Sequence, residues 1–221
     1  IRRYFVIFMK KIISEFLGMM ILTMGVVGSG IMAQNISEGI EGITLLINSV
    51  STAAILIVII MTFREISGAH FNPAVSLSFY MQGKLEKIDF FRYVLSHVLG
   101  AIVGVVFVHI MFDMSILDFS TKDRSGGNII FSEIIASFLL VFIICMSQKR
   151  NDLSVGVIVG VYIGAGYFFT SSTSFANPAI TIARSFTDTY TGIDPTNIIG
   201  FIFAQLIGAY LATKTYNYIR S

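Results

Sequence analysis

Six long apolar stretches are the feature of this sequence that most restricts its fold. They span about residues 12–33, 43–63, 90–111, 129–146, 153–169 and 198–212. A transmembrane helix uses about 20 mainly apolar residues. The composition agrees, because only 13% of the 221 residues are charged, about half the share found in soluble domains. The sequence predicts an all-α integral membrane protein, with residues 1–221 forming one multi-pass domain in the lipid bilayer.

The sequence gives little indication of nucleic-acid binding, metal binding or catalysis. A net charge of +2 is too small for an electrostatic nucleic-acid binder. Cys145 is the single cysteine and the three histidines are far apart, so we expect no metal site, disulfide or cofactor. His70, His97 and His109 have no serine or cysteine partner in a motif context, so we expect that the protein is not an enzyme.

The distribution of basic residues predicts the orientation. With the N-terminus in the cytoplasm, only Lys122, Arg124 and Arg184 of the 15 lysines and arginines lie outside. Cytoplasmic loops of membrane proteins carry the excess of Lys and Arg. We therefore expect both termini in the cytoplasm and the chain in the cell membrane.

The sequence also contains an internal repeat. Its clearest element is one short string that occurs twice, as Asn72-Pro73-Ala74 and as Asn177-Pro178-Ala179. The copies are 105 residues apart, Glu15 matches Glu133, and the segment from His97 matches that from Gln205. The halves span about residues 5–112 and 128–218. Because each half crosses the membrane three times, the second must be inverted relative to the first.

Each Asn-Pro-Ala string is a helix start. Asn is a preferred N-cap, and Pro is favoured at the first helical position because its missing N–H needs no partner there. About two turns of apolar sequence follow each string, so we expect two re-entrant half-helices that meet with their N-termini together at mid-membrane. Their dipoles would repel cations. The side-chain amides of Asn72 and Asn177 would offer hydrogen bonds to a passing oxygen atom.

These motifs resemble those of the major intrinsic protein family, the aquaporins and aquaglyceroporins, over about residues 12–212. The resemblance implies six tilted helices plus two half-helices, a pore in each protomer and a homotetramer. It places the two Asn-Pro-Ala strings at the pore and His70 on its cytoplasmic side. It also implies that Glu15 and Glu133 are buried and accept hydrogen bonds from the loops. From the residues alone, Glu15 could instead snorkel or pair with Lys11.

The sequence departs from the family at the outer constriction. Most members have Arg directly after the second Asn-Pro-Ala, where this chain has Ile180. The family's spacing puts the other constriction positions at Thr52, Ala165 and Ser174. None is aromatic, cationic or large, so we expect a wide and mostly neutral filter, similar to the branch that is associated with metalloid acids and small uncharged solutes.

Arg184 lies four residues after Ile180, about 6 Å farther along the half-helix. It could be a displaced charge in the outer vestibule. It could also pair with Asp188 and neutralise the end of the helix.

The function we expect is passive passage of water, glycerol, urea and undissociated metalloid acids. A water-selective pore is the alternative within the family. A coupled secondary transporter is a third hypothesis, because such proteins also have inverted repeats and broken helices. Coupling needs a carboxylate near the site, and only Glu15 and Glu133 qualify, both near the ends of their spans.

Overall fold

The structure is a computed structural model that describes the backbone of residues 2–220 and the side chains of residues 8–220. Six helices are long and apolar enough to cross a membrane, as predicted. They are α1 (Arg2–Ile36), α2 (Glu41–Ser67), α4 (Lys87–Met111), α5 (Gly127–Ser147), α6 (Asp152–Phe169) and α8 (Ile198–Arg220). Two short helices, α3 (Pro73–Met81) and α7 (Pro178–Arg184), and a 3-10 turn, η1 (Pro195–Asn197), complete the fold. The described residues form no strand.

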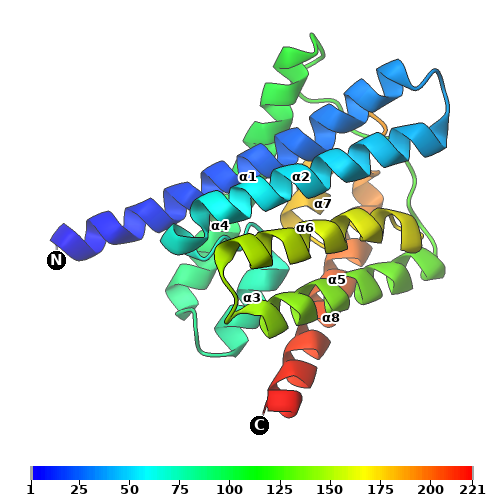
Figure 1. Ribbon diagram of the computed structural model, residues 1–221. Coiled ribbons are helices and arrows are strands. Elements are labelled where there is room, and N and C mark those ends of the chain that lie inside the picture. Colours follow the sequence, from blue (N-terminus) through cyan, green and yellow to red (C-terminus); the bar gives the residue numbers. More distant parts are fainter. Residues whose placement is uncertain (1, 221) are drawn as a thin grey trace.

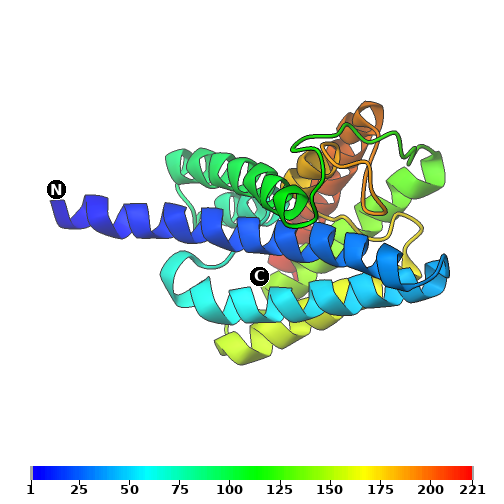
Figure 2. The same ribbon diagram turned by 90° about the horizontal axis from the view of Figure 1, so that it is seen from above.

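Figures 1 and 2 show the long helices around the two short ones, with α2 between α1 and α6. The most extensive helix contacts are those of α1 with α4, α5 with α8, α1 with α2, and α2 with α6. Small residues make the crossings close. A Cβ atom at Gly100 would lie 2.5 Å from the carbonyl oxygen of Phe16, and one at Gly208 would collide with that of Ile134. Helices in lipid pack through such small residues.

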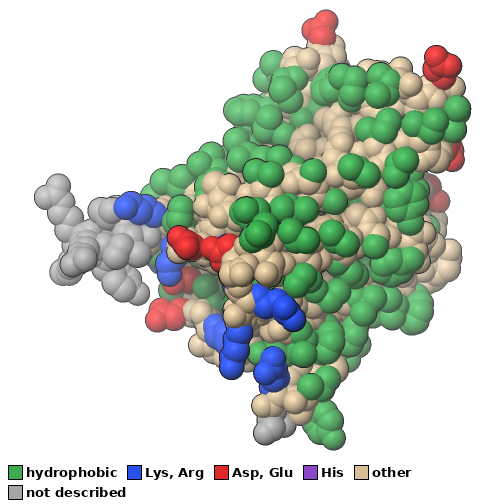
Figure 3. All heavy atoms as spheres, viewed as in Figure 1, with side chains coloured by type: hydrophobic (Ala, Val, Ile, Leu, Met, Phe, Trp, Pro, Cys, Tyr) green, Lys and Arg blue, Asp and Glu red, His purple; other side chains and the backbone are tan. Residues whose placement is uncertain are grey.

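The surface divides into an apolar belt and two polar ends. Large side chains such as Leu95, Val161 and Phe203 are exposed along the helices. Figure 3 shows apolar side chains over most of the face in view and Lys and Arg gathered at its lower left. The chain begins and ends on that side, here called the termini side (Figure 1). The opposite, distal side carries two loops, residues 112–126 and 185–197.

The two distal loops are joined to each other by backbone hydrogen bonds. The amide of Asp118 donates to the carbonyl of Phe186 at 3.1 Å, and that of Asp194 donates to the carbonyl of Lys122 at 2.8 Å. These bonds fix the segment that follows α7 against the connection between the two halves of the chain.

Candidate functional site

The half-helices α3 and α7 begin as the Asn-Pro-Ala strings predict. Asn72 has an extended backbone and its Oδ1 accepts from the amide of Ala74 at 2.8 Å. Asn177 caps α7 in the same way, accepting from Ala179 at 3.0 Å and from Ile180 at 3.4 Å. Each proline occupies the first helical turn, where no backbone N–H is needed.

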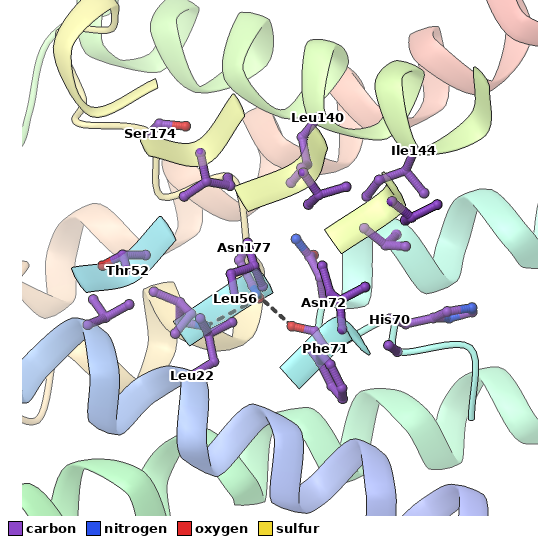
Figure 4. Close-up of a pocket in the computed structure, with 18 of the residues that line it drawn as sticks. Leu22, Thr52, Leu56, His70, Phe71, Asn72, Leu140, Ile144, Ser174 and Asn177 are labelled. Atoms are coloured by element: carbon purple, nitrogen blue, oxygen red, sulfur yellow. Dashed lines mark hydrogen bonds between the residues drawn. The ribbon is translucent and has the colours of Figure 1, made fainter. Parts of the chain in front are cut away.

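The two N-termini are linked to each other by the same asparagine side chains. Nδ2 of Asn72 donates to the carbonyl of Ala176 at 2.7 Å, and Nδ2 of Asn177 donates to the carbonyl of Phe71 at 2.8 Å. Each amide therefore uses one N–H inside the protein and keeps one for the cavity (Figure 4). The sequence alone does not indicate that one N–H of each amide is taken up in this way.

The segments before the asparagines have an unusual backbone that is the same in both copies. Phe71 and Ala176 both have a φ of 46°, and Ala69 and Ser174 have φ values of 52° and 50°. A non-glycine residue in this left-handed region costs about 1–3 kcal/mol and persists only where its surroundings fix it.

Two buried carboxylates fix these segments. Glu15 accepts from the amides of His70 at 3.0 Å and Phe71 at 2.8 Å. Glu133 accepts from the amides of residues 175 and 176, both at 2.9 Å. Both carboxylates are fully buried. Glu15 therefore does not snorkel, and its partners are backbone amides and His97 rather than Lys11.

Each carboxylate has one further side-chain partner from the neighbouring long helix. Nε2 of His97 lies 2.7 Å from Glu15, and Nε2 of Gln205 donates to Glu133 at 2.7 Å. The sequence alignment of His97 with Gln205 thus corresponds to equivalent contacts in the two halves.

A continuous cavity of about 90 Å³ passes the junction of the half-helices. Asn72 and Asn177 lie near its middle (Figure 4), Thr52 and Ser174 toward one end, and His70 toward the other. The remaining wall is mainly apolar, with Leu22, Val26, Leu56, Leu140, Val159 and Ile163 among the lining residues. The prolines and alanines of the two strings do not line it, because their side chains pack into the half-helices' buried surroundings.

The distal constriction differs from the sequence-based assignment at one position. Thr52, Ser174 and Ile180 line the cavity, but Ala165 does not, because it is exposed on the outer face of α6. Tyr167, two residues later, lines the cavity in its place, and its hydroxyl lies 3.1 Å from Oγ1 of Thr52. The expectation that the constriction has no aromatic residue is therefore wrong.

Arg184 lies at the same end of the cavity. Its side chain is 3% exposed, its Nε donates to the carbonyl of Thr191, and its guanidinium stacks 3.4 Å from the ring centre of Phe175. Asp188 instead accepts from the amide of Thr121 at 2.9 Å. The hypothesis of an Arg184–Asp188 pair is thus not supported by these contacts.

The other end of the cavity opens on the termini side. There Nδ1 of His70 lies 2.9 Å from Oγ of Ser76, and the imidazole packs against the Phe79 ring, tilted by 39°. Arg64 also lines this end and forms an ion pair with Asp152 at the turn between α5 and α6. Sequence reasoning did not single out Arg64, since nothing in its local sequence distinguishes it from a surface cation.

Comparisons with known proteins agree with this geometry. The sequence profile described as Major intrinsic protein matches residues 4–216. The aquaglyceroporin AqpS of Rhizobium meliloti (strain 1021) is 45% identical over 203 residues, covering 92% of this chain and 87% of that protein. A probable NIP-type aquaporin of Nicotiana alata is 30% identical, covering 98% and 80%.

A solved structure has the same fold. The X-ray structure of the aquaglyceroporin from Plasmodium falciparum superposes with a TM-score of 0.74 and 20% sequence identity, covering 95% of each chain. The profile match covers nearly the whole chain, and it accords with six apolar helices and two capped half-helices that meet beside a cavity. The chain is therefore an integral, multi-pass membrane protein that belongs to the major intrinsic protein family, whose members are passive channels and not enzymes.

Proposed function

We propose that this protein is a passive channel for water and small uncharged solutes such as glycerol, urea and undissociated metalloid acids. The observation that carries the proposal is the junction of α3 and α7, where Asn72 and Asn177 each keep one amide N–H for a cavity whose other walls are mainly apolar. An oxygen atom that passes can accept two hydrogen bonds there. A water oriented in this way cannot also accept from its neighbours, so a proton wire would be interrupted.

Charge selectivity follows from the same junction. Two helix N-termini each contribute about half a positive charge, and the described lining residues include no carboxylate that could offset it. Cations would therefore be repelled. Glu15 and Glu133 are fully buried and hold the loops through backbone amides, and neither lines the cavity, which argues against the coupled-transporter alternative.

The absence of Arg at Ile180 supports passage of solutes larger than water, and the name of the relative AqpS, an aquaglyceroporin, points the same way. Tyr167 is the observation that favours a water-selective pore instead, because its ring and its contact with Thr52 narrow the same end of the cavity. We give priority to the solute channel because Ile180 stands where most family members have an Arg, so that large charged side chain is missing from this position.

The remaining parts of the proposal concern the assembly. The chain would form one domain of two inverted halves, about residues 5–112 and 128–218, and would associate as a homotetramer with a pore in each protomer. Both termini would face the cytoplasm from the cell membrane, since the termini side carries most of the Lys and Arg.

Glycerol uptake into proteoliposomes distinguishes channel from transporter. We expect a flux that rises linearly up to several hundred millimolar glycerol and is the same with and without Na⁺ or proton gradients. Saturation at a few millimolar, or dependence on an ion gradient, would contradict the proposal.

A further inference from the structure

Three cations, here called the rim, gather on the distal side around one short segment, and one of them, Arg184, lines the cavity. Nζ of Lys122 donates to the carbonyl of residue 190 at 2.8 Å, and Nε of Arg124 donates to that of residue 192 at 2.8 Å. Nε of Arg184 donates to the intervening carbonyl, that of residue 191. The sequence separates these residues by up to 62 positions, so their meeting is a product of the fold.

The carboxylates of the same loops do not pair directly with the three cations. Asp188 accepts from Thr121, Asp123 from Ser125, and Asp194 from Thr196. Among residues 8–220, no ion pair joins any of the three cations to a carboxylate. The three cations therefore have carbonyl oxygens, and no carboxylate, as their direct hydrogen-bond partners.

The rim also keeps unused hydrogen-bond donors. Nη1 and Nη2 of Arg184 make no hydrogen bond with the described residues, although the side chain is 97% buried and lines the cavity. The guanidinium of Arg124 lies 4.9 Å from the centre of the same Phe175 ring that Arg184 stacks on, so both groups contact one aromatic side chain. Oγ of Ser174, 3% exposed and on the same cavity, has no partner among the described residues either.

We propose that Lys122, Arg124 and Arg184 form a binding site for a small carboxylate or similar oxyanion at the distal mouth of the pore. The planar fork of a guanidinium matches two oxygens of such an anion. Ser174 would donate a hydrogen bond from its hydroxyl. The site would hold the anion at the mouth.

The anion would stop at this site. Between this site and the junction of Asn72 and Asn177, the wall is mainly apolar, with side chains such as Leu22 and Leu56. Moving an ion into such surroundings without a compensating partner is very unfavourable. A bound oxyanion would therefore obstruct the path of neutral solutes. This obstruction, unlike the binding itself, rests on the proposed channel function.

Thermal unfolding of the purified full-length protein tests the binding without any flux. Sodium formate is the probe and sodium chloride at equal ionic strength is the reference. We expect formate to raise the unfolding temperature of the wild type above that in chloride, in a saturable manner. Lys122→Gln and Arg124→Gln should each weaken the apparent affinity for formate about 10-fold, as expected for loss of one charged hydrogen-bond donor.

Lys149→Gln is the matched control, because it removes the same charge from the termini side and should leave the formate effect unchanged. Arg124→Lys keeps a charge at the rim and should retain part of the affinity, which separates loss of the site from loss of folding. Equal unfolding temperatures of the wild type in formate and chloride would overturn the proposal. So would a formate effect that persists undiminished in both rim variants, since the three cations would then serve only to hold residues 190–192.

Flux gives the second readout. In right-side-out vesicles, external formate should slow glycerol entry through the wild type, and Lys122→Gln should need about 10-fold more formate for the same slowing. If neither the wild type nor the variant passes glycerol, the channel function fails while the unfolding measurement still decides the binding. If the wild type passes glycerol and binds formate, but formate does not slow the glycerol entry, the claim of obstruction is wrong.

Discussion

The side-chain amide of Asn72 donates to the carbonyl oxygen of Ala176 at 2.7 Å, so each half of the chain is fastened to the other at the centre of the pore. Asn177 makes the reciprocal bond to Phe71. The same asparagines cap their own helices, so one residue type both starts the half-helix and sets the distance between the two N-termini.

Asn72→Asp separates these two roles. Aspartate still caps α3 through a carboxylate oxygen, but it cannot donate to Ala176, whose carbonyl would be left without this partner. We expect a loss of about 1–3 kcal/mol in unfolding free energy, measured by denaturation in detergent. The added negative charge should also admit cations, which ion-flux measurements in liposomes would detect. Unchanged stability together with unchanged cation exclusion would show that the cross-link and the neutral junction are both unimportant.

The buried carboxylates Glu15 and Glu133 have different side-chain partners, so the partner found in one half can be placed in the other to test its contribution to stability. His97→Gln places at Glu15 the residue type that Gln205 presents to Glu133. We expect it to change the unfolding free energy by less than about 1 kcal/mol. His97→Leu removes the partner of a fully buried carboxylate and should cost about 3–5 kcal/mol. Equal losses for both variants would mean that size, rather than hydrogen bonding, matters at this position.

Tyr167 should control which solutes fit through the distal constriction. Tyr167→Ala removes the ring and the contact with Thr52, and we expect the glycerol permeability to rise about 10-fold relative to that of water. Ala165→Leu is the matched control on the same helix, because Ala165 faces away from the cavity. An effect of Ala165→Leu that equals that of Tyr167→Ala would restore the assignment made from spacing.

Ile180 should leave the position directly after Asn177-Pro178-Ala179 uncharged, although Arg184 lines the same end of the cavity. Ile180→Arg introduces the residue that the sequence resemblance places there in most family members. We expect glycerol permeability about 10-fold lower, with water flux nearly unchanged, in stopped-flow light scattering. Glycerol flux equal to that of the wild type would remove Ile180 from the constriction.

Formate binding at the proposed site of Lys122, Arg124 and Arg184 should depend on pH through Lys122. Burial, followed by the positive charges of Arg124 and Arg184, lowers the pKa of Lys122 to about 8, while Glu41 acts in the opposite direction. Because the ammonium loses its proton as the pH rises through this value, formate protection against unfolding should weaken between about pH 7 and 9. Lys122→Arg stays charged over this range and should show a flat profile. Parallel profiles for the two proteins would exclude Lys122 as the titrating group.

The fold was predictable from the sequence because its signals are local. Apolar stretches of membrane-spanning length, and Asn-Pro at the start of each half-helix, depend only on nearby residues. The loop partners of Glu15 and Glu133 came from the family resemblance, because the residues alone left Glu15 free to snorkel or to pair with Lys11. The structure shows equivalent contacts of the two carboxylates in the two halves.

The constriction was less predictable. No motif fixes the helical register within α6, so spacing alone selected Ala165, and the true lining residue, Tyr167, lies two positions later. The rim of Lys122, Arg124 and Arg184 could not be predicted at all, because it depends on how two loops far apart in the sequence join on the distal side.

Stopped-flow and ion-flux measurements on wild-type proteoliposomes test the central claim most directly. The account predicts that water and glycerol both cross faster than in protein-free liposomes, while Na⁺ and proton conductance stays at the protein-free level. Water flux without glycerol flux would contradict the proposal that Ile180, in place of Arg, leaves the constriction open to glycerol. Na⁺ or proton conductance above the protein-free level would contradict cation exclusion at the junction of Asn72 and Asn177.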